Sequence, residues 1–245
     1  MAPLASKLVL VTGASSGIGQ AIAESLAQSG YSVIGTYNKS EKKAREISVK
    51  FPRIKFVQVN LTNRPSRSKF ISTLKDQTFF ALVNNAGEYE TDEINQTNLT
   101  AWDKQIELHL TAPIDLIRNL FPQIQPGGVI LNIASILGPN ISSYKSVGYA
   151  ASKSALSEIT KTLAVMLQKS RIRVNTISPG LITSPPTLKS SSSWVKKVAN
   201  QTPIGQNGSP EDIAKIVKFL LSPDSKIING QVIVADGGFS IINDF

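Results

Sequence analysis

Two side chains in the middle of the sequence have types and spacing that suit proton transfer. Tyr149 and Lys153 lie four positions apart in YAASK, so on a helix both would lie on one face. Tyrosine and lysine side chains both serve in acid–base catalysis. Ser135 ends an apolar run upstream, and ligands of open α/β sheets bind at the carboxyl ends of strands. The three residues can therefore converge on one site, although a surface Tyr–Lys pair and a serine in a turn are the ordinary alternative.

The only histidine in the chain, His109, lies in IELHLTAP (106–113). A lone histidine can be an acid or base, a ligand, or a polar group packed on a helix face, and this stretch alone does not decide between them. The chain has no cysteine, which excludes disulfides, thiolate nucleophiles and cysteine-based zinc sites. Because no cluster of carboxylates stands out either, we predict no metal site.

The composition indicates an ordered globular protein. Of 245 residues, 41% are hydrophobic and 18% charged, which is enough apolar material for a large core. No apolar stretch approaches the ~20 residues of a membrane span, and the N-terminus lacks a signal-peptide pattern, so we expect a cytoplasmic protein without a membrane partner. The net charge of +9 suits phosphorylated cofactors or acidic carriers. Because the basic residues are scattered, a solvated basic surface is favoured over nucleic-acid binding.

Short apolar runs alternate with helical patterns along the whole chain. Near-continuous apolar runs are typical of parallel strands that helices cover on both faces. The expected strands are 7–12, 31–36, 55–60, 79–84, 127–135, 172–179 and 230–236. No composition shift divides the chain. We therefore predict one α/β domain over residues 1–245, with a doubly wound, seven-stranded parallel sheet of the Rossmann type.

Two helices are predicted most clearly, and one region breaks the alternation. The segments 19–29 and 149–170 place apolar residues at helical spacing, among them Ile22 and Leu26 on one face of the first. From Pro179 to Pro210 the chain instead carries several prolines and a run of serines. A loop of that length in a compact domain is usually functional, so we predict a substrate lid at about 181–210.

A glycine-rich turn, TGASSGIG (12–19), separates the first strand from the first helix. Gly13 allows a tight turn, Gly17 lets the backbone approach a pyrophosphate, and Gly19 lets the helix pack closely on the sheet. The helix N-terminus supplies amide donors to a phosphate. We predict a dinucleotide site here that also includes Ser15, Ser16 and Ile18.

The residues after the second strand help to decide whether NAD(H) or NADP(H) binds. An acidic residue at this place would pair with a free ribose 2′-hydroxyl and repel a 2′-phosphate. Asn38, Lys39 and Ser40 instead offer hydrogen-bond donors and a positive charge, with no carboxylate before Glu41. This favours NADP(H) over NAD(H), with a solvated lysine at a helix start as the plain alternative.

Taken together, these motifs resemble the short-chain dehydrogenase/reductase family over essentially the whole chain. The resemblance is carried by TGASSGIG, NNAG (84–87), Ser135, the Tyr149–Lys153 motif, SPG (178–180) and ADGG (235–238), in this order and spacing. It implies that Tyr149 gives a proton to a substrate carbonyl, Lys153 binds the nicotinamide ribose and lowers the tyrosine pKa, and Ser135 positions the carbonyl. One lysine cation at about 4 Å supplies roughly the 4 kcal/mol needed to bring a tyrosine pKa of ~10 close to neutrality.

The resemblance also implies which other residues bind the cofactor and the substrate. Asn60 and Leu61 replace the usual Asp–apolar pair beside adenine, and an amide oxygen can still accept from the adenine amine. Further cofactor positions are Asn85, Ala86, Gly87, Pro179, Gly180, Ile182, Thr183 and Ser184. The predicted substrate positions are Leu137, Tyr144, Leu181 and Trp194. Relatives are usually homotetramers, and we expect a homotetramer or homodimer.

His109 is the largest departure from the family in the active site. It occupies the position of an asparagine that, at a local helix irregularity, holds a water linking the catalytic lysine to solvent. Three interpretations remain open: His109 holds the same water, shuttles protons itself, or simply packs.

The function predicted from the sequence is NADPH-dependent reduction of a ketone or a 3-oxoacyl thioester to an alcohol. An acyl carrier is a candidate partner because of the positive net charge. Two alternatives are a reductase of pterins or other C=N substrates, which the histidine in place of asparagine suggests, and a non-catalytic NADP(H)-binding sensor or scaffold. The intact Ser135, Tyr149 and Lys153 argue against the sensor, because a sensor needs only the binding loop.

Overall fold

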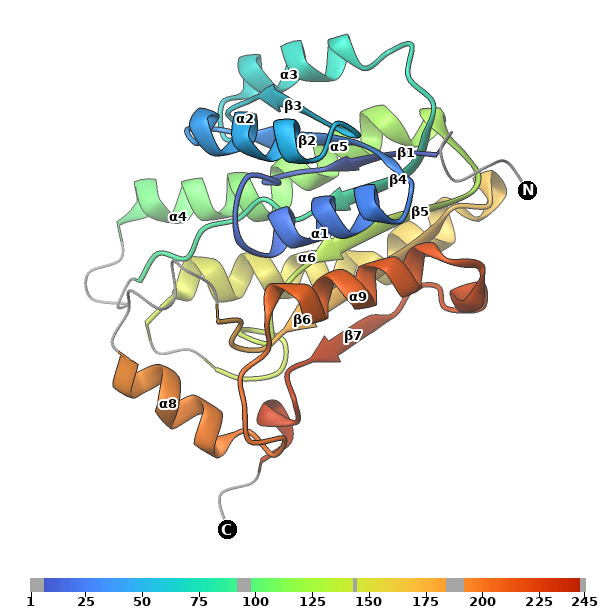
Figure 1. The fold of residues 1–245 in the computed structure, drawn as a ribbon. Helices are drawn as coiled ribbons and strands as arrows, with labels where there is room; N and C mark the ends of the chain where they lie inside the picture. Colours follow the sequence, from blue (N-terminus) through green and yellow to red (C-terminus); the bar gives the residue numbers. More distant parts are fainter. Residues whose placement is uncertain (1–6, 92–97, 143–144, 184–191, 243–245) are drawn as a thin grey trace.

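A seven-stranded parallel sheet forms the centre of the computed structural model, which describes residues 7–91, 98–142, 145–183 and 192–242 (Figure 1). Its strand order is β3-β2-β1-β4-β5-β6-β7. The strands are β1(Leu8–Val11), β2(Ser32–Tyr37), β3(Ile54–Gln58), β4(Phe79–Asn84), β5(Ile124–Ile133), β6(Arg173–Pro179) and β7(Val232–Ala235). This confirms the predicted doubly wound α/β fold. The order reverses between β1 and β4, and ligands of such sheets bind at the carboxyl ends of the strands at this point.

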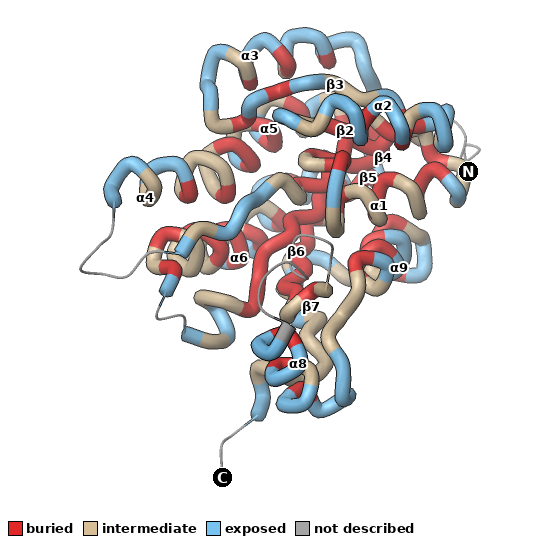
Figure 2. The backbone as a smooth tube through the Cα atoms, turned by 60° about the vertical axis from the view of Figure 1, so that its left-hand side comes forward, coloured by how far each residue is buried: buried red, intermediate tan, exposed pale blue. Residues whose placement is uncertain are grey.

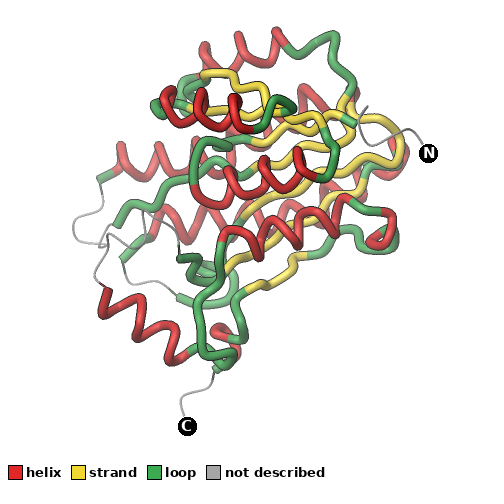
Figure 3. Tube along the Cα trace, viewed as in Figure 1, coloured by secondary structure: helices red, strands yellow, loops and turns green. Residues whose placement is uncertain are grey.

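Helices cover both faces of this sheet (Figure 3). They are α1(Gly17–Gln28), α2(Glu41–Lys50), α3(Arg64–Thr73), α4(Leu99–Ile106), α5(Ala112–Leu120), α6(Val147–Met166), α8(Ser192–Gln201) and α9(Pro210–Leu221). Helices α1 and α9 pack side by side on one face, while α3, α5 and α6 contribute to the apolar cluster on the other. A π-helical turn, Glu107–Thr111, joins α4 to α5.

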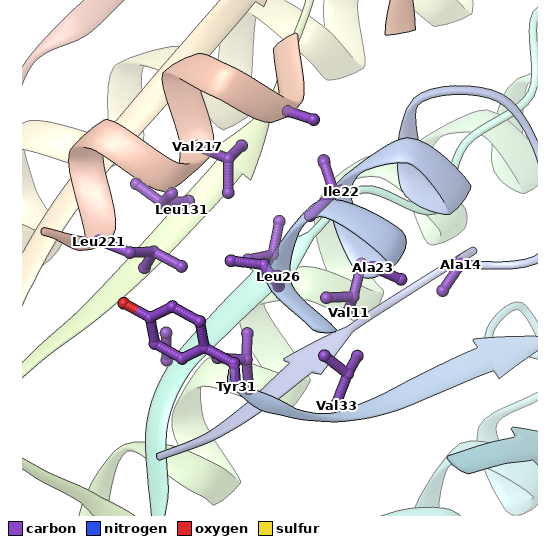
Figure 4. Packing of buried hydrophobic residues seen from close by; sticks show 14 of the residues in the cluster. Val11, Ala14, Ile22, Ala23, Leu26, Tyr31, Val33, Leu131, Val217 and Leu221 are labelled. Carbon is purple, nitrogen blue, oxygen red and sulfur yellow. The ribbon is translucent and has the colours of Figure 1, made fainter. Parts of the chain in front are cut away.

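Both clusters bury their side chains almost completely. Leu26 of α1 lies among Val11, Leu131 and Val217, and all four are fully buried (Figure 4). Each such side chain contributes about 1.5–3 kcal/mol by leaving water. In β4 all six residues are buried, so the middle of the sheet has no solvent-facing side (Figure 2). This explains why the central strands read as continuous apolar runs rather than alternating ones.

The structure differs from the sequence prediction mainly at element ends and in the predicted lid. The long helix α6 begins two residues earlier than predicted and ends at Met166, with a 3-10 turn over Gln168–Ser170. The region 181–210 is not simply a loop, because it contains α8, whose Val195 and Val198 are buried. The run of serines before Trp194 favours a loop, and the sequence therefore did not predict this helix. Within the described part of the chain, no helix is long and apolar enough to cross a membrane.

Candidate active site

The three glycines of the first turn have different surroundings. A Cβ on Gly13, whose φ is +66°, would lie 2.9 Å from Ala86 Cα. A Cβ on Gly19 would lie 2.3 Å from the Gly13 carbonyl oxygen, which explains the close packing of α1 at this point. Gly17, with φ +55°, has no neighbouring atom within 4 Å of such a Cβ and therefore borders open space. The turn is thus closed on the sheet side and open at Gly17.

The open side of this turn suits a diphosphate. No side chain caps the N-terminus of α1 at Ser16, and the first turn carries no acidic residue. The first amides of a helix have no intrahelical partner, and the helix dipole makes this end positive. Unpaired donors facing open space at Gly17 are what the pyrophosphate of a dinucleotide requires. The residues present therefore fit the predicted cofactor.

The NNAG segment holds the glycine turn in place. Thr12 Oγ1 accepts hydrogen bonds from the amides of Asn85 and Ala86, both at 2.9 Å. Asn85 Nδ2 returns a hydrogen bond of 2.9 Å to the Thr12 carbonyl. These bonds tie the end of β4 to the end of β1, so Asn85 and Ala86 act first as supports of the cofactor turn.

At the adenosine end, Asn38 and Lys39 are exposed directly after β2. Lys39 takes part in none of the ion pairs among the described residues, which leaves its charge available to a phosphate. Ser40 precedes α2 without capping it through its side chain. All three positions predicted for the 2′-phosphate therefore lie together at one sheet edge.

Asn60 is less free than the sequence suggested. Its Oδ1 accepts hydrogen bonds from the Thr62 amide at 3.1 Å and from Thr62 Oγ1 at 2.8 Å. An adenine amine would have to compete with both. Leu61 is buried, and its carbonyl accepts from Arg67 Nη1, so Leu61 belongs partly to the core. These local partners could not be read from the sequence.

The structure brings Ser135, Tyr149 and Lys153 together beside the glycine turn. Ser135 follows β5, and Tyr149 and Lys153 lie in the first two turns of α6. The Ser135 hydroxyl lies close enough to that of Tyr149 to lower the tyrosine pKa, and Lys153 Nζ donates to the Ile133 carbonyl at 2.8 Å. A Cβ on Gly138 would lie 2.3 Å from the Ala150 carbonyl oxygen, so the loop after Ser135 packs directly on α6. This close contact sets the serine beside the tyrosine.

Burial dominates the electrostatics of these groups. It lowers the pKa of Lys153 from 10.5 to about 7. It also raises the pKa of Tyr149, although the nearby Ser135 hydroxyl acts in the opposite direction. The protein groups alone thus do not lower the tyrosine pKa as expected from the sequence. The lysine charge favours the phenolate, but burial of the phenolate in the protein costs more.

The ring of Tyr149 lies between two other rings. Tyr89 meets it edge to face with ring centres 5.1 Å apart, and His109 does so at 5.2 Å. The Tyr89 hydroxyl accepts a hydrogen bond of 3.0 Å from Ser146 Oγ. The sequence indicated the segment from Glu88 to Asn98 after NNAG for substrate specificity but did not single out Tyr89 within it.

His109 is fully buried in the π-helical turn between α4 and α5. Its Nε2 accepts from the Glu88 amide at 3.2 Å, and its Nδ1 lies 3.1 Å from Ser152 Oγ. A Cβ on Gly87 would lie 3.1 Å from His109 Nε2 and 3.6 Å from Lys153 Nζ. Burial, and secondarily the Lys153 charge, lowers the pKa of His109 from 6.5 to about 2. The imidazole is therefore neutral at physiological pH.

This buried neutral histidine predicts a pH dependence of stability. The pKa of His109 is 6.5 in its unperturbed state and about 2 in the fold, so between these values the unfolded chain binds the additional proton. The free energy of unfolding should therefore fall as the pH drops below 6.5, by up to about 1.4 kcal/mol per pH unit. Urea unfolding at pH 7.5 and pH 5.5 measures this, and the His109→Gln variant should show a smaller difference. An equal difference in both proteins would contradict the prediction.

The nicotinamide and substrate ends are described in part. Gly180 packs on the ADGG turn, where its Cβ would lie 2.8 Å from Asp236 Cβ. Ile182 pairs with Gly208, and the Thr183 amide donates to the Gly208 carbonyl at 2.8 Å, so the start of the predicted lid is fixed to its end. Pro179 is the last residue of β6. Ser184 lies outside the described residues.

Three of the four predicted substrate residues lie in the described structure. Leu137 and Leu181 are half-buried, and the Leu137 amide donates to Ser135 Oγ at 3.1 Å. Trp194 of α8 has 50% of its surface exposed. Tyr144 lies outside the described residues. The structure thus places Leu137 next to Ser135 and leaves Trp194 exposed on α8.

The fold and the site define a dinucleotide-binding α/β oxidoreductase. The profile of the family described as Enoyl-(Acyl carrier protein) reductase matches residues 13–240. The chain belongs to this family of short-chain dehydrogenases/reductases.

Known relatives cover nearly its whole length. It is 31% identical over 241 residues to an uncharacterized oxidoreductase, YmfI, of Bacillus subtilis, covering 96% of this chain and 99% of the relative. It is 34% identical to the 3-oxoacyl-[acyl-carrier-protein] reductase FabG of Staphylococcus epidermidis, covering 95% and 98%. Among solved structures, the angucycline C-6 ketoreductase LanV with bound NADP superposes with a TM-score of 0.91 at 29% identity, covering 98% and 97% of the two chains.

Proposed function

We propose that this oxidoreductase uses NADPH to reduce a carbonyl group to an alcohol, with Tyr149 as the general acid. The observation that carries the proposal is the closeness of the Ser135 hydroxyl to that of Tyr149, with Lys153 one helical turn after Tyr149 on α6. Two neighbouring hydroxyls can converge on one substrate oxygen. The relatives named as 3-oxoacyl reductase and as ketoreductase support the same chemistry.

The cofactor would be held by groups already described. The first amides of α1 and Gly17 suit its diphosphate, and Lys39 with its neighbours suits a 2′-phosphate. Structures similar to this chain include a ketoreductase with bound NADP and a blue fluorescent protein in complex with NADPH. When bound, the reduced nicotinamide supplies the hydride for the carbonyl carbon.

The protein supplies the proton and stabilises charge on the substrate oxygen. Tyr149 Oη donates its proton to the carbonyl oxygen, and Ser135 Oγ donates a hydrogen bond to the same atom. Lys153 stabilises the resulting tyrosinate. Positioned general acids contribute about 10²–10⁴ to the rate, and a donor aimed at a developing oxyanion about 10²–10³.

A 3-oxoacyl thioester on an acyl carrier is the substrate that we favour. Two exposed lysines of α8, Lys196 and Lys197, lie beside Trp194 on the lid and would face an acidic carrier. Carbonyl reduction is favoured over enoyl reduction because the paired hydroxyls of Ser135 and Tyr149 suit an oxygen acceptor, whereas an enoyl substrate needs its proton on carbon. The histidine at position 109 bonds only within the protein, so it gives no reason to prefer a C=N substrate.

We also propose that the protein assembles as a homotetramer or homodimer. Near the end of α6, Met166 and Val165 have 70% and 65% of their surfaces exposed, and Ile114 of α5 is partly exposed as well. On the same helix, Ala155, Ile159 and Leu163 are only partly buried within one chain. A partner copy would cover these apolar side chains. Light scattering on the purified protein gives the mass of the assembly.

The cofactor preference can be tested at Lys39. Changing Lys39→Asp places a negative charge where the 2′-phosphate would lie, so the NADPH-to-NADH ratio of kcat/KM should fall tenfold or more, about 1.4 kcal/mol. Lys218→Asp on α9 makes the same charge change at an exposed position and should leave the ratio unchanged. An unchanged ratio in Lys39→Asp would remove this residue from the cofactor site.

The proposed reaction is tested by NADPH consumption against a panel of substrates. The panel contains 3-oxoacyl thioesters on pantetheine and on an acyl carrier, 2-enoyl thioesters, simple ketones, quinones and pterins. We expect the highest kcat/KM with a 3-oxoacyl thioester. If the protein reduced only enoyl thioesters or only pterins, the proposed function would be wrong and that substrate class would take its place.

A further inference from the structure

His109 links two segments that are far apart in the sequence. The Glu88 amide, just after NNAG, donates to His109 Nε2 at 3.2 Å. His109 Nδ1 lies 3.1 Å from Ser152 Oγ, and Ser152 Oγ donates to the Tyr149 carbonyl at 2.8 Å. A single chain of hydrogen bonds therefore runs from the segment after β4, through the imidazole, to the backbone of Tyr149 at the start of α6.

This chain fixes the proton on one ring nitrogen. Because Nε2 accepts from an amide, it carries no hydrogen, and a neutral imidazole then has its proton on Nδ1. Nδ1 donates to Ser152 Oγ, whose own hydrogen points to the Tyr149 carbonyl. Each donor and acceptor in the chain is used once, with no conflict.

We propose that His109 is a positioning residue, a neutral tether that joins the Glu88 amide to Ser152 and thereby fixes the ring of Tyr149. The inference rests on the proposed function only in that Tyr149 is the acid whose orientation matters. The imidazole edge-to-face contact with Tyr149, at 5.2 Å, is the direct link to that ring. The π-helical turn is the local feature that carries His109 inward between α4 and α5.

The other two interpretations from the sequence conflict with these contacts. A proton shuttle needs a nitrogen that takes up and releases protons, but a proton on Nε2 would face the Glu88 N–H. Lys153 and Tyr149 lie near the ring, and the lysine charge further opposes protonation. Glu88 bonds the ring through its amide, while its carboxylate pairs with Lys104. A water holder needs a free nitrogen, and both already have protein partners.

Because this is the only histidine, nuclear magnetic resonance can observe it without assignment ambiguity. The full chain, labelled with ¹⁵N-histidine and produced without a histidine tag, gives one pair of imidazole nitrogen signals. We expect the Nδ1–H tautomer and no titration between pH 8 and pH 5. An Nε2–H tautomer, or a titration midpoint within that range, would contradict the proposed role of His109. This readout does not depend on activity, so it can fail while the proposed function holds.

Matched variants test what the tether does. The carboxamide of His109→Gln reaches the place of Nε2 and can accept from Glu88, whereas that of His109→Asn lies near Nδ1 and can donate to Ser152. His109→Ala keeps neither contact. We expect the alanine variant to lose about tenfold in kcat, the factor that one ordinary hydrogen bond represents, with the KM for NADPH within about twofold. The glutamine and asparagine variants should each recover part of the loss.

The pH profile separates a tether from a shuttle. All variants should keep the shape of the wild-type kcat profile between pH 5 and pH 7, because His109 does not ionise there. Loss of an ionisation near pH 6 in His109→Ala would indicate a shuttle and overturn the proposal. If His109→Ala had the same kcat as the wild type, the imidazole would only fill space and the proposal would be wrong. Far-ultraviolet circular dichroism checks that each variant is folded, and the nitrogen measurement on the wild type remains decisive if one is not.

Discussion

Replacing Tyr149 by phenylalanine is expected to lower kcat for carbonyl reduction by about 10²–10⁴-fold, the contribution of a positioned general acid. The variant keeps the ring next to those of Tyr89 and His109 and loses only the hydroxyl, which lies near Ser135. Packing and NADPH affinity should therefore change little. Initial rates of NADPH oxidation and a fluorescence titration with NADPH measure the two quantities.

Tyr89→Phe is the matched control for this loss. It removes a hydroxyl from the neighbouring ring, where the oxygen accepts only from Ser146 among the described contacts. We expect a change of a few-fold at most, since a neutral hydrogen bond at a half-exposed site contributes about 1 kcal/mol. If Tyr149→Phe kept near wild-type kcat, another group would be the acid and the mechanism would be wrong.

Replacing Lys153 by methionine is expected to have opposite effects on activity and on stability. Lys153 Nζ is buried and donates to the Ile133 carbonyl, and no carboxylate in the described part of the chain forms an ion pair with it. Its pKa falls from 10.5 to about 7 in the fold. Methionine removes the buried charge but keeps a similar apolar stem, so the free energy of unfolding at pH 7 should rise by on the order of 2–4 kcal/mol. Activity should be nearly abolished.

The pH dependence of this gain follows from the direction of the pKa shift. Between pH 7 and 10.5 the unfolded chain binds the additional proton, so wild-type stability rises with pH across this window. The advantage of Lys153→Met should thus shrink when urea unfolding is repeated at pH 10. A variant less stable than the wild type at pH 7 would mean that the hydrogen bond to Ile133, rather than burial of the charge, dominates at this position.

Much of the fold could be predicted because its determinants are local. Strands buried on both faces, such as β4, give continuous apolar runs, and Gly13 and Gly19 mark the turn where side chains would collide. Helix α8 was not predicted because it is short and its few apolar residues stand between the serine run before Trp194 and Pro203. Element ends differ from the prediction by one to four residues where hydrogen bonding, rather than hydropathy, decides them.

The sequence predicted which main residues come together in the candidate site. It did not predict their hydrogen-bond partners or the direction of their pKa shifts. Ser135, Tyr149 and Lys153 converge because parallel strands present their carboxyl ends at one edge. Contacts from irregular segments had no periodic signal, which is why Tyr89 was missed. The partners of His109 depend on a π-helical turn, and a sequence pattern cannot place such a turn to the nearest atom. The pKa shifts depend on burial, which only coordinates supply.

Transfer of a labelled hydride tests the central claim most directly. The wild-type protein is supplied with NADPH carrying deuterium at nicotinamide C4 and with a 3-oxoacyl thioester, and the product is analysed by mass spectrometry. The account predicts a 3-hydroxyacyl thioester with deuterium on the carbinol carbon, formed by the wild type and not by Tyr149→Phe. Consumption of NADPH without deuterium at that carbon, or equal product from the phenylalanine variant, would contradict it.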